Sequence, residues 1–261
     1  MIHLMRIIIV AGCLLIVMGV FSFFLWDVFF PEKKEAVPVT LVEEAAPAPR
    51  EVVSVKAPQQ EAPLPESFLI PNVPFTVQAP LGQWQDPLYQ DGCEEASLAM
   101  ARAWVQGTVL TAKGVTEEIA KLALFEKKQF GQSVDTSIQD TAWLLENYHG
   151  ITTGVVGRGV MIDMIKRALV SGKIVIVPAD GRKLKNPNFK QPGPPRHMLV
   201  IVGYDDATAE FIVNDPGTRH GEGYRYAQDV LYGAILDYST GKHVEVTSVD
   251  KVMLTVGREQ F

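Results

Sequence analysis

The chemistry that this chain could perform centres on a cysteine, a histidine and an aspartate. Cys93 stands in the segment QDGCEEASLAM, where turn residues give way to a predicted helix. The first N–H groups of a helix lack intrahelical partners and carry partial positive charge, which favours a thiolate. Glu94 and Glu95 follow directly and oppose that effect. Taken alone, a cysteine in this position is more often a packed core residue than a nucleophile.

His197 opens the apolar segment HMLVIVGY, directly after a proline-rich loop, and Asp215 ends the next apolar segment, EFIVND. If the two segments pair as an antiparallel hairpin, the start of the first lies beside the end of the second. The carboxylate of Asp215 can then accept the imidazole N–H and leave the other ring nitrogen to face a thiol. Cys93, His197 and Asp215 would thus form a Cys–His–Asp set for acyl transfer. The alternative for His197 is a satisfied histidine at a strand end.

The elements that must position these residues follow from the hydrophobic pattern. Helical periodicity dominates the first half of residues 67–261, and short apolar or alternating segments dominate the second half. This order, without regular alternation, indicates an α+β fold with an antiparallel sheet. The predicted helices are 94–106, 116–128 (capped by Thr116), 137–148, 161–170 and 227–238, and the predicted strands are 173–178, 197–204, 210–215 and 251–256.

The amino-terminal third has a different composition. Residues 7–26 contain no charge and are long enough to cross a bilayer as a helix, so residues 1–30 are predicted to be a membrane anchor. A signal peptide and a buried helix are the alternatives. Residues 31–66 are rich in proline, alanine and glutamate and lack aromatic residues, which is typical of an unfolded linker. Residues 67–261 are predicted to form one domain.

The net charge and the cysteine content exclude several classes of function. A formal net charge of −6 argues against a nucleic-acid-binding protein. The two cysteines, Cys13 and Cys93, can form neither a disulfide framework nor a four-cysteine zinc site. His220 could join His197 and Asp215 around a metal, but the paired histidine spacing of such sites is missing. No metal and no other cofactor is therefore predicted.

Four segments together resemble the C39-like cysteine peptidases of bacteria, which have a papain-like fold. They are VPFTVQAP, DGCEEASLAM, RHMLVIVGYDD and FIVNDPG, within residues 70–256. In that fold a helix that carries the cysteine packs on an antiparallel sheet that carries the histidine and the aspartate. The resemblance implies these roles: Cys93 as nucleophile, His197 as general base and then acid, Asp215 as the residue that orients His197, and Gln78 as an oxyanion donor, with Gln85 and Gln90 as alternatives to Gln78.

The chain departs from the family pattern at Glu94, where the family commonly has glycine. It also lacks the GxxxxGK[ST] motif, so it is not the type of peptidase that is fused to an ABC exporter. The predicted function is a membrane-anchored cysteine peptidase with a peptide or protein substrate, whose domain lies outside the cytoplasmic membrane of a bacterium. A papain-like binding module without activity, for peptides or cell-envelope components, is the alternative, and another acyl transfer is a third possibility.

The segment 182–196, RKLKNPNFKQPGPPR, carries five basic residues and no acidic one directly before His197. It is either a solvated loop or a border of the cleft that attracts an acidic or carboxylate-bearing substrate.

Overall fold

The structure is a computed structural model that describes residues 62–241, 243 and 246–258. The predicted anchor, with its span at residues 7–26, lies outside the described residues, as does the predicted linker up to residue 61. Within the described residues, no helix has both the length and the apolar character needed to cross a bilayer. The chain divides into two units, Met1–Gln59 and Gln60–Phe261, and all the described residues belong to the second unit.

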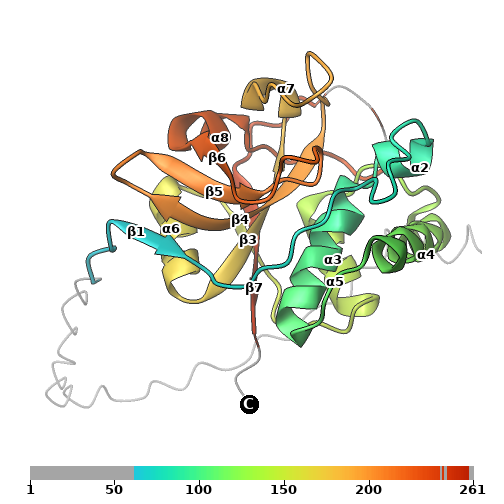
Figure 1. Cartoon of the computed structure of the whole chain (residues 1–261), viewed down its shortest axis with the longest axis horizontal. Coiled ribbons are helices and arrows are strands. Elements are labelled where there is room, and N and C mark those ends of the chain that lie inside the picture. The colour runs from blue at the N-terminus through green and yellow to red at the C-terminus, as the bar shows by residue number, and fades with distance from the viewer. Residues whose placement is uncertain (1–61, 242, 244–245, 259–261) are drawn as a thin grey trace, which may run out of the picture. The chain divides into compact units, whose positions relative to one another are not determined.

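One antiparallel sheet of seven strands forms the centre of this unit in the described part of the chain (Figure 1). Its order is β2–β7–β3–β4–β5–β6, and β1 pairs with the carboxyl end of β4. Strands β3, β4 and β7 are buried almost throughout, which agrees with their continuous apolar sequences. The strands are β1 (Ser67–Leu69), β2 (Val155–Arg158), β3 (Lys173–Ala179), β4 (His197–Asp205), β5 (Glu210–Asn214), β6 (Tyr224–Ala227) and β7 (Val252–Gly257).

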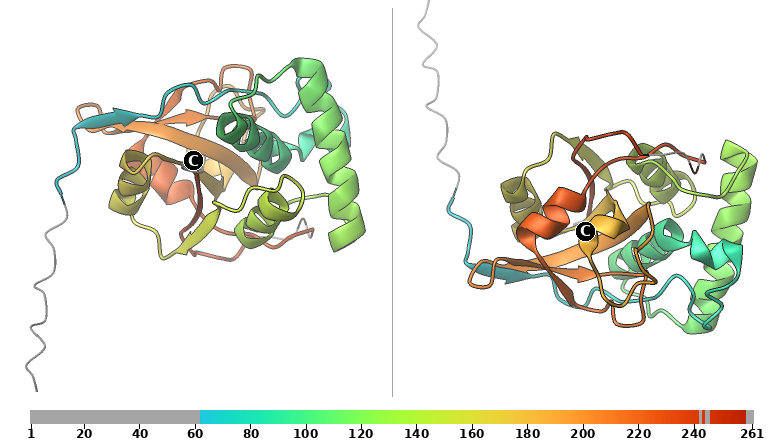
Figure 2. Two further views of the ribbon diagram at one scale, coloured as in Figure 1. Left: turned by 90° about the horizontal axis from the view of Figure 1, so that it is seen from below. Right: turned by 90° about the horizontal axis from the view of Figure 1, so that it is seen from above.

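The helices form two groups around the sheet. Figure 1 shows α3, α4 and α5 together to the right of the sheet, and α6 and α8 in the left half of the picture, where β1, β5 and β6 also lie; the views in Figure 2 also separate these groups. The α+β fold with an antiparallel sheet is therefore confirmed. The helices of the described residues are α2 (Pro87–Gln90), α3 (Cys93–Gln106), α4 (Ala112–Phe130), α5 (Ile138–Asn147), α6 (Ile162–Val170), α7 (Gly181–Leu184) and α8 (Gln228–Ala234).

Two predicted helix boundaries are wrong. Helix α4 begins before the predicted position, because Thr111 is its N-cap and its hydroxyl accepts the N–H of Gly114. Thr116, the predicted cap, lies within the helix and donates its hydroxyl to the carbonyl of Ala112. Helix α8 ends at Ala234, so the last residues of the range predicted as helix 227–238 lie beyond it.

Helix α3 is the element that carries Cys93 to the sheet. It packs against β4 and α4, and its side chains Leu98, Met100 and Trp104 are buried. The helix ends where Gly107 adopts the left-handed conformation with a φ of 64°, as the sequence predicts. Apolar burial along α3 therefore fixes its position relative to the first residues of β4.

Candidate active site

Cys93 is the first residue of α3. The N-cap of the helix is Gly92, so no side chain accepts a hydrogen bond from the first turn at this position. The N–H of Ala96 donates to the carbonyl of Gly92. The N–H groups before Ala96 therefore have no intrahelical carbonyl as a partner, and those of Glu94 and Glu95 contact their own carboxylates. The Cys93 side chain is buried, with 6% of the residue exposed.

His197 and Asp215 meet at one end of the β4–β5 hairpin. The predicted hairpin is confirmed, since β4 and β5 pair antiparallel and Val200 lies opposite Asn214. Nε2 of His197 lies 2.7 Å from Oδ1 of Asp215, and both side chains are almost fully buried. This bond uses Nε2, so Nδ1 is the ring nitrogen that can face a thiol.

Asp215 is held by further donors. The hydroxyl of Tyr226 donates to Oδ2 over 2.6 Å, and the N–H of Gly217 donates to Oδ1 over 2.9 Å. Asn186 in turn donates to the Tyr226 hydroxyl over 2.6 Å. Burial acts to raise the pKa of Asp215, but the charge of His197 and the bonds from His197, Tyr226 and Gly217 outweigh it. The pKa of Asp215 therefore lies below its ordinary value.

Packing also fixes the imidazole ring of His197. Phe189 contacts the ring edge-on, with ring centres 5.3 Å apart. Gly217 passes so close that a Cβ atom there would lie 2.8 Å from Cε1 of His197. A larger residue than glycine at this position would displace the ring, so the backbone after Asp215 helps to orient His197.

Cys93 and His197 line the same cavity, which has a volume of about 650 Å³. Its other walls come from residues 78–90, from the loop 188–196 after α7 and from the loop 217–220 after β5. The later part of the basic segment before His197 thus borders the cavity, which is one of the two alternatives that the sequence leaves open. The structure brings the cysteine and the histidine to one opening, with the aspartate behind the histidine.

The sulfur of Cys93 is hydrogen-bonded to Glu94. Sγ donates to Oε2 of Glu94 over 2.9 Å, and the N–H of Met198 contacts the sulfur. In the described part of the chain no hydrogen bond joins Sγ to His197. Burial, the charge and hydrogen bond of Glu94 and the charge of Glu95 raise the pKa of Cys93 well above its ordinary value, against the effect of the Met198 N–H. Cys93 is therefore a thiol in this arrangement.

Gln78 lines the cavity, as expected for an oxyanion donor. Its Nε2 donates to the carbonyls of Tyr89 over 2.9 Å and Gln90 over 2.8 Å, while its Oε1 is buried and has no partner among the described residues. Both amide hydrogens are thus engaged. Gln85 and Gln90 line the same cavity, and the oxyanion role stays a prediction for all three.

A group of possible metal ligands lies near Cys93. One ligand atom from each of Asp91, Asp135 and His243 falls within 4.8 Å of the others. However, Nε of Arg196 lies 2.5 Å from Oδ2 of Asp135. This guanidinium already supplies positive charge to the carboxylates, so we assign no metal to the group.

The sequence-based prediction missed two tyrosines at the site, Tyr226 beside Asp215 and Tyr238 beside Glu94. The alternation of the segment YRYA indicates a short strand and could have identified β6 and Tyr226. Tyr238 falls in the predicted helix 227–238, and no local pattern indicates its contact with Glu94.

A buried imidazole–carboxylate pair and a helix-start thiol around one cavity, on an α+β scaffold, define a cysteine-peptidase-like domain. The model of the Peptidase_C39 like family matches residues 70–239, and the chain belongs to this family. The resemblance inferred from the sequence is thus confirmed.

The solved structures that match the chain include the following two. A chain from Bacillus anthracis described as a C39-like peptidase is 17% identical, with a TM-score of 0.45, and the match covers 75% of this chain and 100% of that one. Xylellain, a cysteine protease from Xylella fastidiosa, is 13% identical, with a TM-score of 0.44, and the match covers 76% of this chain and 88% of that one. No curated protein matches the sequence.

Proposed function

We propose that the chain is a cysteine peptidase that hydrolyses peptide bonds, with Cys93 as nucleophile, His197 as general base and then acid, and Asp215 as the residue that orients His197. The observation that carries this proposal is the cavity that Cys93 shares with His197, whose Nε2 is bonded to a buried carboxylate. Membership of the Peptidase_C39 like family supports it.

The mechanism follows from these positions. The thiol proton passes to Nδ1 of His197, and the sulfur attacks the carbonyl carbon of the substrate. Asp215 stabilises the imidazolium that results, because its carboxylate is held in the charged form by several donors. His197 then protonates the leaving amine, and a water molecule activated by His197 hydrolyses the thioester.

The oxyanion formed during attack needs donors. We assign this role to N–H groups at the start of α3 and to Gln78, once its amide leaves the backbone carbonyls to which it now donates. Such a donor is worth about 3–4 kcal/mol in comparable enzymes. Gln78→Ala is therefore expected to lower the rate by a hundredfold or more.

The test of the proposal is turnover of peptides by the full chain. Cys93→Ala and His197→Ala are expected to abolish cleavage of a fluorogenic peptide library, and Cys13→Ala is the matched control because it removes the other cysteine of the chain. Cleavage that survives Cys93→Ala, or a complete lack of cleavage by the wild type, would contradict the proposal.

The second candidate function is a papain-like module that binds peptides or cell-envelope components without cleaving them. The bond from the Cys93 thiol to Glu94 is the observation that favours it. Saturable binding of a peptide by the wild type, with an affinity equal to that of Cys93→Ala and with no product formed, would support this alternative.

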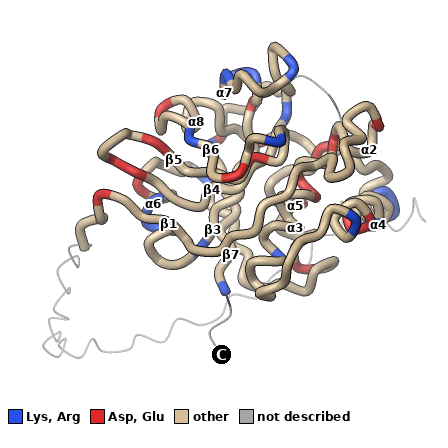
Figure 3. Tube along the Cα trace, in the orientation of Figure 1, with Lys and Arg blue, Asp and Glu red and all other residues tan. Residues whose placement is uncertain are grey.

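We further propose that the substrate is an acidic or carboxylate-bearing peptide. Lys190, Arg196 and Arg219 line the cavity, and no Asp or Glu is among the residues that line it in the described part of the chain. Arg196 is paired with Asp135, so Lys190 and Arg219 carry this argument. Figure 3 shows basic residues along α7 and the loop that follows it. In a chain with a net charge of −6 this local excess of cations is a property of the cavity rather than of the whole surface.

We also propose that residues 7–26 anchor the chain in the cytoplasmic membrane of a bacterium and that the domain lies outside it. The uncharged apolar run followed by the proline-rich segment supports this layout. Added protease is expected to release the domain from intact cells, and full protection of the domain would reverse the orientation.

A further inference from the structure

The carboxylate of Glu94 contacts the atom that would perform the chemistry. Its Oε2 accepts the thiol hydrogen of Cys93 over 2.9 Å. Glu94 lies in the first turn of α3, with 2% of the residue exposed. A glutamate at a helix start is ordinarily a solvated residue that interacts with the helix dipole. Burial against a sulfur is a different arrangement, and it needs an explanation.

The other carboxylate oxygen of Glu94 is also engaged. Oε1 accepts the hydroxyl of Tyr238 over 2.8 Å and the backbone N–H of Thr136 at 3.4 Å. Both of these donors are neutral groups, a phenol and a peptide N–H. The carboxylate is therefore held in one orientation by hydrogen bonds that bring no positive charge to it.

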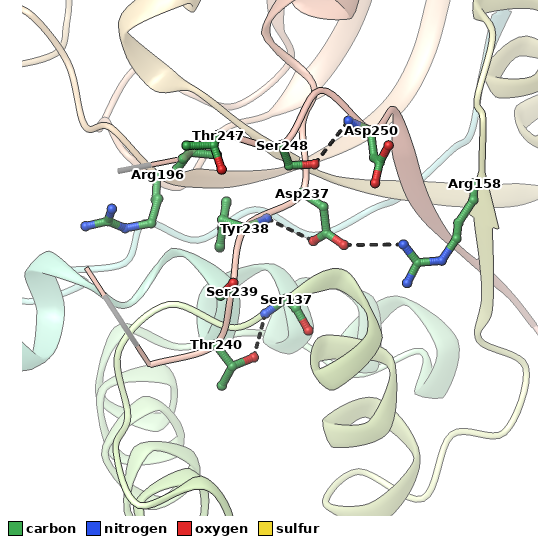
Figure 4. Close-up of a pocket in the computed structure, with 11 residues that line it drawn as sticks. Ser137, Arg158, Arg196, Asp237, Tyr238, Ser239, Thr240, Thr247, Ser248 and Asp250 are labelled. Atoms are coloured by element: carbon green, nitrogen blue, oxygen red, sulfur yellow. Dashed lines mark hydrogen bonds and ion pairs between the residues drawn. The ribbon is translucent and has the colours of Figure 1, made fainter. Parts of the chain in front are cut away.

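The segment that carries Tyr238 is itself fixed to α5. The N–H of Ile138 donates to Asp237 over 3.0 Å, and the N–H of Ser137 donates to Thr240 over 2.9 Å. Figure 4 shows Asp237 and Thr240 on either side of Tyr238, and it shows Asp237 turned toward the guanidinium group of Arg158. Tyr238 is thus a rigid donor, and the position of Glu94 at the sulfur is built into the fold.

The charged and titratable groups that face Glu94 come from four parts of the chain. Cys93 and Glu95 lie on α3, Glu126 on α4, Asp135 in the loop before α5, and Tyr238 follows α8. Burial and the charge of Asp135 raise the pKa of Glu94, against the bonds from Cys93 and Tyr238. Glu94 can therefore take up a proton more readily than an exposed glutamate.

We propose that Glu94 is a further catalytic residue, which as a carboxylate holds Cys93 in the thiol form and on taking up a proton releases the sulfur to His197. The proposal rests on the proposed function, in which Cys93 is the nucleophile. One proton from solvent adds to Oε2 of Glu94. The thiol proton moves from Sγ to Nδ1 of His197, and the new O–H of Glu94 donates to the thiolate. The active form thus carries one proton more than the resting form.

The experiment measures the rate at which iodoacetamide alkylates Cys93, from pH 5 to pH 9, in the full chain with Cys13→Ala, so that Cys93 is the only thiol. Glu94→Gln keeps the shape of the side chain and removes the charge. Removal of a contacting like charge lowers the pKa of a thiol by about 1–3 units, which increases the fraction of thiolate at pH 8. A thiolate of lower pKa is also less nucleophilic, and this offsets part of the increase, so the alkylation rate is expected to rise about 3- to 50-fold. We expect this increase at pH 8 and a ratio that falls toward 1 as the pH is lowered and Glu94 takes up a proton in the wild type.

Glu95→Gln is the matched control, because Glu95 is equally buried on the same helical turn but makes no hydrogen bond to the sulfur in the described part of the chain. We expect its alkylation rate at pH 8 to stay closer to that of the wild type than the rate of Glu94→Gln. Tyr238→Phe is the second variant. This variant removes a donor to the Glu94 carboxylate and therefore raises the pKa of Glu94 further. Glu94 then ionises at a higher pH than in the wild type, and the fall in alkylation rate that accompanies its ionisation is expected at that higher pH.

The outcomes are distinguishable from those that test the proposed function, because alkylation needs no substrate. Equal alkylation rates for Glu94→Gln and Glu95→Gln at pH 8 would overturn the proposal even if the wild type cleaves peptides. Slower alkylation of Glu94→Gln would also overturn it, because Glu94 would then be the base that removes the thiol proton. Faster alkylation of Glu94→Gln without any peptide cleavage would support control of the thiol by Glu94 and contradict the peptidase function.

Discussion

Tyr226→Phe is expected to lower the free energy of unfolding of the domain by an amount that depends on pH. The Tyr226 hydroxyl donates to Oδ2 of Asp215 over 2.6 Å and accepts from Asn186 over 2.6 Å. Its removal leaves a buried carboxylate oxygen and a buried amide donor without a partner. A hydrogen bond to a charged group contributes about 1.5–3 kcal/mol, and we expect a loss of this size in the free energy of unfolding at pH 7.

The sign of the pH dependence follows from the Asp215 pKa. This pKa is depressed in the folded protein, so Asp215 stabilises the fold above its unfolded pKa, and that contribution is lost as the pH falls through its folded pKa. Without the Tyr226 hydroxyl the pKa of Asp215 rises, so the loss begins at a higher pH. The difference between the two proteins is expected to shrink at acid pH, where Asp215 is protonated in both.

The assay is urea unfolding of the full chain between pH 3 and pH 8, together with the pH profile of turnover. Tyr224→Phe is the matched control, because Tyr224 lies on the same strand and its ring contacts that of Tyr226, with centres 4.7 Å apart. Tyr224 donates no side-chain hydrogen bond within the described residues. If both variants lose the same stability at every pH, the hydroxyl does not support Asp215 and the prediction is wrong.

Two other predictions concern charge. Burial raises the pKa of Glu126 to about 8, above its ordinary 4.5, so its contribution to stability is present at acid pH and is lost as the pH rises toward 8. Glu126→Gln should therefore stabilise the fold at pH 8 by up to about 5 kcal/mol and have little effect near pH 4, and urea midpoints that differ equally at both pH values would contradict this. Reversal of the cavity charges by Lys190→Glu and Arg219→Glu should lower kcat/KM for acidic peptides about tenfold or more at low salt, and less at high salt. Lys183→Glu, a reversal outside the cavity lining, is the control, and an equal loss in that variant would refute the assignment.

The sequence predicts the elements whose pattern is local. Helix α3 shows a continuous apolar stripe and a glycine stop, and the β4–β5 hairpin shows two apolar runs around a turn. Because antiparallel pairing follows from the hairpin, the contact of His197 with Asp215 can be predicted from these two neighbouring segments alone.

Contacts between distant segments cannot be predicted in this way. The alternation of YRYA can indicate strand β6 and place Tyr226 on it, but it does not show that Tyr226 lies beside Asp215. Tyr238 lies more than a hundred residues from Glu94, and its contact depends on how the segment after α8 packs on α5. The predicted cap of α4 is wrong because two threonines fit the local signal, and Thr111 rather than Thr116 accepts an N–H of the first turn, that of Gly114.

Two buried carboxylates beside the reacting groups have opposite environments. Asp215 is buried, yet donors and the charge of His197 lower its pKa, so it stays ionised and can support an imidazolium. Glu94 is equally buried, but the groups that act on it are acidic or neutral and its pKa is raised. Groups of one chemical type whose pKa values are driven apart mark different proton-transfer roles. In the mechanism that we propose, the ionised carboxylate fixes the base and the protonatable one controls the nucleophile, so that acidification releases a thiol that the ionised Glu94 holds inert.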